Sequence, residues 1–280
     1  MFRSMGGAAF GSLFKATDFT TQTSNTTLTV PNGANAIHIQ AAVGGGASGV
    51  NGFSYDKSGG ESAGTAGGSG AYVSDKVFSV SQGETLTLIV GAGGTGNTGG
   101  YPNQQGVDGE NTVLSGSSTG SIFTLGAGEA GGSTGGSSPN GSVRTNLPSA
   151  GGTATIDGTT ITSGTFIEAN GASVTFATAT TLNQGPVGIF DQSGNGEAGF
   201  TGNNCSGDNC RVDGSVGGDS YADNIAGGTA GTASGAGTAG GDGTRGSGGG
   251  GGAAQVDGGG FTLGGDGGDG EIIYRFIKVL

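Results

Sequence analysis

Glycine recurs at every third position from Gly228 to Gly252, and this period limits the possible folds of the chain more than any other feature. Eight of the nine positions in that register are glycine, and the ninth, Ser234, is also small. The other two registers of the window hold only three and two glycines, so the period is not a by-product of glycine richness. Three residues per turn is the repeat of the extended left-handed helix that makes no internal hydrogen bonds. The window therefore predicts extended helices that form their hydrogen bonds with neighbouring tracts.

A glycine at each third residue leaves one edge of such a helix without Cβ atoms, so another backbone can approach closely. The glycines predicted to make this contact are Gly228, Gly231, Gly237, Gly240, Gly243, Gly246, Gly249 and Gly252. Gly240-Gly241 and Gly248–Gly252 are the expected points of reversal. Alanine at Gly237 or Gly240 is expected to harm assembly more than alanine at Gly235 or Gly241.

Composition narrows the fold class further. Glycine makes up 70 of 280 residues, a quarter of the chain, against an average usage of about 7%. Glycine inside a helix costs about 0.5–1 kcal/mol relative to alanine, which excludes a helical bundle, and five prolines are too few for collagen. Only dense hydrogen bonding between tracts offsets this entropy cost. The alternative is disorder, and the regular period and the flanking strands favour order.

Several short runs read as β-strands because apolar and polar residues alternate in them. They are residues 26–30, 36–43, 71–80, 85–90 and 271–280. The last run is apolar on both faces, which predicts a buried central strand. Ser81–Glu84 is expected to close a hairpin between its two flanking runs.

A second group of β-like runs lies in the middle of the chain. Asp157-Gly158 and Asn170-Gly171 each separate two such runs and accept the positive φ angles of a tight hairpin turn. Residues 139–225 are therefore expected to form a hairpin- and loop-rich insertion in a glycine-rich domain spanning 19–280. The expected fold is all-β with packed polyglycine-II-type helices of period three and no significant α-helix.

The order of these elements resembles the glycine-rich domain of bacteriophage tail fibres and related virion proteins. The residues that carry the resemblance are the blocks 29–34, 41–46, 67–73, 82–94 and 264–273. The resemblance covers residues 20–138 and 226–280 and leaves 139–225 unexplained. Some adhesins at phage fibre tips are similar in the glycine tracts as well, and there packed polyglycine helices present variable loops to the host surface.

The resemblance implies a virion component that binds a host surface or another virion protein, and it brings no catalytic residues. Our first hypothesis is a non-enzymatic, homotrimeric adhesin in the virion, attached through residues 1–18 to tail or capsid proteins. Its distal loops would contact a host receptor, either a glycan or an outer-membrane protein. The alternative is a capsid fibre or decoration protein. A remote alternative is ice binding, because Thr229, Thr232, Thr238 and Thr244 share one phase of the period-three tract.

Aromatic residues in loops are the candidates for receptor contact, because aromatic side chains anchor interfaces and stack on sugars. These candidates are Phe53, Tyr55, Tyr101, Phe190, Phe200 and Tyr221. The charge balance excludes other partners: nine Lys plus Arg against 21 Asp plus Glu leave no basic surface for nucleic acid. No apolar run approaches the ~20 residues of a membrane-spanning helix, so membrane insertion is not expected.

Little else in the sequence suggests chemistry. Cys205 and Cys210 enclose a short loop and are either a disulfide, which we favour, or free thiols, or two ligands of a zinc site. Gly264–Asp269 matches the calcium-binding pattern G-G-x-G-x-D only once, and an acidic glycine turn is the preferred interpretation. His38, the single histidine, lies mid-strand and is expected to be structural. No metal, cofactor or enzymatic activity is expected.

Overall fold

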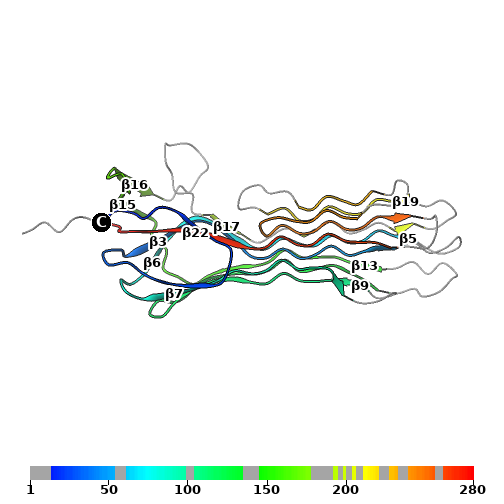
Figure 1. Cartoon of the computed structure of the whole chain (residues 1–280), viewed down its shortest axis with the longest axis horizontal. Coiled ribbons are helices and arrows are strands. Elements are labelled where there is room, and N and C mark those ends of the chain that lie inside the picture. The colour runs from blue at the N-terminus through cyan, green and yellow to red at the C-terminus, as the bar shows by residue number, and fades with distance from the viewer. Residues whose placement is uncertain are drawn as a thin grey trace, which may run out of the picture.

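The computed structural model describes residues 14–53, 61–98, 104–134, 145–177, 192–194, 198–199, 204–205, 211–220, 227–232, 239–255 and 261–280. These residues form β-strands and extended tracts and contain no α-helix. The molecule is elongated: a β-sheet head occupies one end, and a shaft of extended segments leads away from it to a tip (Figure 1). The predicted all-β class is therefore confirmed for the described part of the chain.

Two antiparallel five-stranded sheets build the head. Sheet A has the strand order β1 (Thr20–Gln22), β22 (Glu271–Ile277), β3 (Ala36–Val43), β6 (Tyr72–Ser79) and β17 (Gln192–Gly194). Sheet B has the order β14 (Ala154–Ile156), β11 (Gly120–Leu125), β10 (Thr112–Gly116), β7 (Thr85–Ile89) and β2 (Thr26–Thr29). A separate hairpin, β15 (Ser163–Ile167) and β16 (Ser173–Ala177), belongs to the same end of the molecule (Figure 1).

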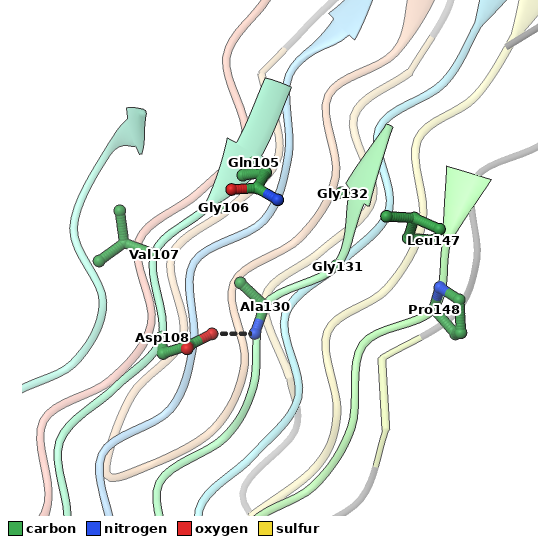
Figure 2. Close-up of a pocket in the computed structure, with 9 residues that line it drawn as sticks. All are labelled: Gln105, Gly106, Val107, Asp108, Ala130, Gly131, Gly132, Leu147 and Pro148. Carbon is green, nitrogen blue, oxygen red and sulfur yellow. Dashed lines mark hydrogen bonds between the residues drawn. The ribbon is translucent and has the colours of Figure 1, made fainter. Parts of the chain in front are cut away.

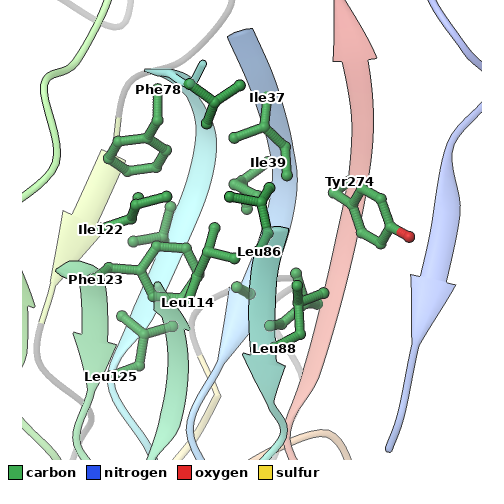
Figure 3. Packing of buried hydrophobic residues seen from close by; sticks show 14 of the residues in the cluster. Ile37, Ile39, Phe78, Leu86, Leu88, Leu114, Ile122, Phe123, Leu125 and Tyr274 are labelled. Atoms are coloured by element: carbon green, nitrogen blue, oxygen red, sulfur yellow. The ribbon is translucent and has the colours of Figure 1, made fainter. Parts of the chain in front are cut away.

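The head core lies between the two sheets (Figure 3). The core side chains come from alternate positions of each strand. In β7, Leu86 and Leu88 are buried, while their neighbours in the strand face outward. Phe78 of sheet A packs against Phe123 of sheet B, with ring centroids 5.9 Å apart. Each such side chain contributes about 1.5–3 kcal/mol when fully buried. Within the described residues, the head is thus the part that an ordinary apolar core stabilises.

The predicted strands are confirmed, but the predicted hairpin at Ser81–Glu84 is wrong. β6 pairs with β3 and β17 in sheet A, whereas β7 pairs with β2 and β10 in sheet B. The turn therefore carries the chain from one sheet to the other, because both strands place apolar residues against the shared core. β22 lies between β1 and β3 and is buried along almost its whole length, as a central strand was predicted to be.

One of the two Xxx-Gly turns predicted in the middle of the chain is also wrong. β14, which precedes Asp157-Gly158, pairs with β11, and Thr160 after it forms a bridge with Phe78 of sheet A. Asp157-Gly158 is therefore a second crossover between the sheets. Asn170-Gly171 does close the hairpin of β15 and β16, and only its glycine has positive φ, +89°.

The shaft is built from backbone groups of the glycine-rich tracts. Along residues 44–50, consecutive N–H groups donate in turn to three different tracts, and the cycle repeats every three residues. The donor and acceptor pairs are Gly44, Ala47 and Val50 to Ala71, Gly68 and Thr65; Gly45 and Ser48 to Glu110 and Val107; and Gly46 and Gly49 to Gly268 and Gly265. In each of these partner tracts the acceptor residue number falls by three whenever the donor residue number rises by three. All three partner tracts therefore run antiparallel to tract 44–50.

Tracts 44–51 and 247–253 are each enclosed by six neighbouring tracts. Tract 44–51 donates to three tracts and accepts hydrogen bonds from three others, through Gly128, Gly94 and Gly249. Tract 247–253 has the same surroundings, and its donors and acceptors lie in tracts 44–51, 63–71, 213–220, 227–232, 239–244 and 263–270. Backbone–backbone contacts replace an apolar core here, because residues without Cβ atoms let six neighbours approach.

This enclosure corrects two expectations about Gly228–Gly252. The chain reverses at Arg245-Gly246, where φ is +45° and +75°, and Gly248–Gly252 is part of a straight, enclosed tract. A Cβ added at Gly249, which is in the period-three register, would overlap a neighbouring carbonyl oxygen, but so would one at Gly250 or Gly251, which are not. Every side of an enclosed tract faces a neighbouring backbone, so a Cβ is excluded at each glycine there. The period-three register therefore decides which glycines are required only in outer tracts. Gly237 lies outside the described residues.

Candidate functional site

The tip is the end of the shaft away from the head, where outward tracts end in short strands (Figure 1). Three small sheets form there. They are β13 (Thr145–Leu147), β12 (Gly132–Thr134), β9 (Gln104–Gly106) and β8 (Asn97–Thr98); β18 (Asn204–Cys205), β5 (Glu61–Ser62), β4 (Gly52–Phe53) and β21 (Phe261–Thr262); and β19 (Arg211–Val212) and β20 (Ala254–Gln255). In chain order, five connections join tip strands to one another: 54–60, 99–103, 135–144, 206–210 and 256–260.

Carboxylate and amide side chains bond outer tracts together where a backbone acceptor is missing. Asp108 Oδ1 and Asn111 Oδ1 accept hydrogen bonds from the backbone N–H groups of Ala130 and Ala127, at 2.7 and 2.9 Å. Asp266 Oδ1 and Asp269 Oδ1 accept from Gly96 and Gly93 in the same way, at 2.7 and 2.8 Å. Each pair is spaced by three residues on both tracts, which matches the repeat of the shaft.

This role changes the interpretation of Gly264–Asp269. The segment is a straight tract, not an acidic turn: Gly265 and Gly268 donate to Gly250 and Ser247 of the tract beside it. Its two aspartates are acceptors for a neighbouring backbone. Among the described residues, no three His, Cys, Asp or Glu side chains are grouped closely enough to hold a metal ion.

A groove of about 540 Å³ opens on the side of the shaft next to the tip (Figure 2). Residues 105–108 form one wall, residues 130–132 form the floor, and Leu147 with Pro148 forms the other wall. Gln105 and Asp108 make the first wall polar, and the Asp108–Ala130 hydrogen bond fixes it to the floor. Leu147 is 37% exposed, so the opposite wall presents apolar surface to solvent. Gly131 and Gly132 leave the floor free of bulky side chains.

The outside of the shaft is strongly acidic. Its described tracts carry the half-buried or exposed acids Asp108, Glu110, Glu129, Asp213, Asp219, Asp242, Asp266 and Asp269. Arg245 is the one basic residue in the same described tracts and their turns, and its Nε lies 3.6 Å from Glu271 Oε1. The described surface of the shaft therefore attracts cations and repels anions, and its charge does not repel neutral ligands.

The aromatic residues predicted as receptor contacts fall mostly outside the described residues. Phe53 is in β4 at the tip, and Tyr55, Tyr101, Phe190, Phe200 and Tyr221 are among the residues the structure does not describe. The described residues beside Phe190 and Tyr221, in β17 and at Ser220, belong to the head and to the head end of the shaft. The six aromatics therefore stay a prediction.

Three further sequence predictions meet the structure in part. Cys205 is in β18 at the tip, whereas Cys210 lies outside the described residues, so their disulfide stays a prediction. Thr229 and Thr244 are exposed but lie on different antiparallel tracts joined through Gly241, so they do not share one helix edge. None of the described residues form a helix long and apolar enough to span a bilayer.

His38 is structural, as expected, and belongs to a buried polar cluster on the outer side of sheet A. Its Nδ1 accepts a hydrogen bond from Arg275 Nε at 3.2 Å, and its Nε2 lies 3.4 Å from Asp75 Oδ1. Arg275 also donates to Glu168 at 2.7 Å, and its guanidinium lies over the ring of Phe19, 4.3 Å from the centroid. The cluster joins the β15–β16 hairpin to the sheet.

A family model described as "Glycine-rich domain" matches residues 20–277, so the chain belongs to the glycine-rich domain family. The match includes residues 139–225, which the resemblance in the sequence had left out. No curated protein matches the chain.

Sequence reasoning missed the groove wall at Gln105, Leu147 and Pro148. No motif marks these residues, and they lie on separate strands and tracts that only the lateral packing of the shaft brings together. An exposed leucine followed by proline in a glycine-rich region was the only available signal.

Proposed function

We propose that the glycine-rich tracts are polyglycine-II-type helices. The three-residue cycle of hydrogen-bond partners along residues 44–50 supports this, because a helix with three residues per turn directs successive N–H groups at about 120° to each other. Six neighbours around a tract are also what a hexagonal packing of such helices requires. NMR chemical shifts and couplings of the tract residues test the proposal. φ near −75° supports it, and φ near −140°, as in antiparallel strands, overturns it.

We further propose that the protein is a non-enzymatic phage virion component, a tail fibre or fibre-tip adhesin, that recognises a receptor on the host surface. The difference between the two ends of the molecule carries this proposal. The first described residues and the C-terminus belong to the head, and the strands that five chain connections join in sequence lie at the opposite tip (Figure 1). A rigid shaft with an anchoring end and a loop-bearing end suits a protein that presents loops at a distance from a particle.

Binding of the soluble full chain to host cells tests the adhesin proposal. We expect it to bind the cells and to block infection, and we expect these activities to fall at least tenfold when residues 54–60 and 99–103 are replaced by glycine-serine segments of equal length. A matched control replaces Thr23 by serine and Ser24 by glycine in the exposed turn between β1 and β2 of the head. No binding by the parent chain, with its density found on capsid sites of intact particles, would support a capsid decoration protein instead.

A further inference from the structure

The groove beside the tip has the size of a small, compact ligand. Its volume of about 540 Å³ is within the usual range of small-molecule sites. Its polar wall spans only residues 105–108, which is roughly 10 Å at the rise of an extended chain. That length suits one or two sugar rings and is too short to seat a long peptide segment.

The two walls differ in chemistry. Asp108 uses Oδ1 to accept from Ala130, and no described residue donates to its second carboxylate oxygen. The Gln105 amide likewise has no hydrogen-bond partner in the described part of the chain, so it offers both a donor and an acceptor. Leu147 and Pro148 face them across a floor of Ala130, Gly131 and Gly132 (Figure 2). A ligand with one hydroxyl-rich edge and one C–H face matches both walls at once.

The acidic residues in and near the groove restrict the charge that a ligand can carry. Asp108 is in the wall, and Glu110 and Glu129 are exposed on the tracts that continue from the wall and the floor. None of the described residues that line the groove is basic. Phosphate, sulfate and uronic acid groups would meet the Asp108 carboxylate and a negative field, and the Gln105 amide is an uncharged donor that does not offset this repulsion, so an acidic saccharide is disfavoured.

We propose that this groove binds an uncharged saccharide unit, with hydroxyls bonded to Gln105 and Asp108 and the C–H face of the ring packed on Leu147 and Pro148. The inference rests on the proposed function, because it names a ligand class for the receptor-binding end of the molecule. It differs from that proposal in placing recognition on the side of the shaft as well as in the tip loops.

Titration of the ¹⁵N-labelled full chain with neutral sugars tests the inference. The probes are glucose, galactose, mannose, N-acetylglucosamine and lactose, with glucuronic acid as the anionic comparison. For at least one neutral sugar we expect saturable shifts at Gln105, Gly106, Asp108, Gly131 and Leu147, with a Kd in the millimolar range. No saturable shift with any probe overturns the inference, and so does glucuronic acid binding as tightly as the neutral sugars.

Two variants and one matched control separate the groove from the rest of the shaft. Gln105→Ala and Leu147→Ala are each expected to weaken sugar binding about tenfold. Leu263→Ala, which changes an exposed leucine on another tract, should leave it unchanged. Equal binding by all three variants, or saturable binding of a basic peptide in the groove in place of sugar, overturns the inference. A chain that binds host cells but none of these sugars leaves the adhesin proposal intact and removes only this one.

Discussion

Glu84 is a buried carboxylate at the turn between the two head sheets, and it shows how single residues fix the connections of this fold. Its oxygens accept hydrogen bonds from Ser81 N at 2.8 Å, Thr119 N at 3.0 Å and Thr119 Oγ1 at 2.7 Å. Burial alone would raise the pKa of the Glu84 carboxyl, but the hydrogen bonds from Ser81, Thr119 and Ser118 outweigh it and lower the pKa below its ordinary value. The charged carboxylate therefore holds the sheet crossover to the β10–β11 turn.

Glu84→Gln is expected to lower the free energy of unfolding at pH 7 by about 2 kcal/mol, because hydrogen bonds to a charged acceptor are lost. The folded pKa is lower than the unfolded pKa of about 4.3, so this stability is present above that pH and is lost as pH falls through the folded pKa. Urea denaturation at pH 7 and pH 3 measures it. A difference between parent and variant that is as large at pH 3 as at pH 7 would contradict the assignment.

Gly240 and Gly241 test the close approach of backbones in an outer tract. A Cβ at Gly240 would overlap the carbonyl oxygen of Gly250, which is fixed in an enclosed tract, whereas a Cβ at Gly241 would meet chiefly the Thr229 hydroxyl, which can rotate away. Gly240→Ala is expected to cost about 2–4 kcal/mol of stability and Gly241→Ala about 1 kcal/mol or less. Thermal melts of the two variants measure the difference. Equal losses would mean that Gly240 is not held against a rigid neighbour.

Among the elements, the β15–β16 hairpin was the one that the sequence predicted most clearly. The way in which this hairpin packs against the rest of the head was the least predictable feature. Asn170-Gly171 between two alternating runs is a strong local signal for a turn, since the glycine accepts positive φ. The docking of the hairpin depends on Phe166 and Phe176, which pack with Ile277 near the end of the chain. That contact joins residues about 100 positions apart, and no local pattern specifies it.

Phe176→Ala is expected to loosen the hairpin with little effect on the two sheets. The side chain is 2% exposed, so its removal leaves a cavity and is expected to lower the free energy of unfolding of the hairpin region by about 3–5 kcal/mol. Hydrogen exchange should accelerate by more than tenfold across residues 163–177 and stay slow in β3 and β22. Ser173→Ala, at an exposed position of the same strand, is the control and should change little. Faster exchange throughout the head would show that the hairpin is part of one cooperative unit.

At the scale of the whole molecule, stability comes from two different sources. The head buries an apolar core, whereas the shaft buries backbone hydrogen bonds between tracts and places most of its charge outside. Both enclosed tracts obtain all six neighbours from the same chain, so enclosure requires no second copy. The homotrimer expected from the resemblance stays a prediction, and sedimentation of the full chain measures it.

The acidic shaft predicts that salt stabilises the protein. Eight acids and one base on the described tracts repel each other on balance, and ions screen this repulsion beyond about 8 Å at 0.15 M ionic strength. The melting temperature at pH 7 is expected to rise by several degrees between 10 mM and 300 mM NaCl. Calorimetry with NaCl, and with sucrose at matched osmolality as a control, measures it. A fall in melting temperature with NaCl would show that ion pairs dominate the shaft.

The sequence by itself determined head strands β2, β3, β6, β7 and β22, the Asn170-Gly171 turn and the three-residue spacing of the shaft, whereas it did not mark β10 and β11 of sheet B. Each follows from periods and turn residues that act over a few positions. Tertiary structure decided which strands share a sheet, which tracts are enclosed, and where Gln105 meets Leu147. Glycine has no side chain to specify a partner, so nearly identical tracts can be told apart only by the contacts they make after packing. For that reason Arg245-Gly246, and not the glycine run after it, became the point where the chain turns back.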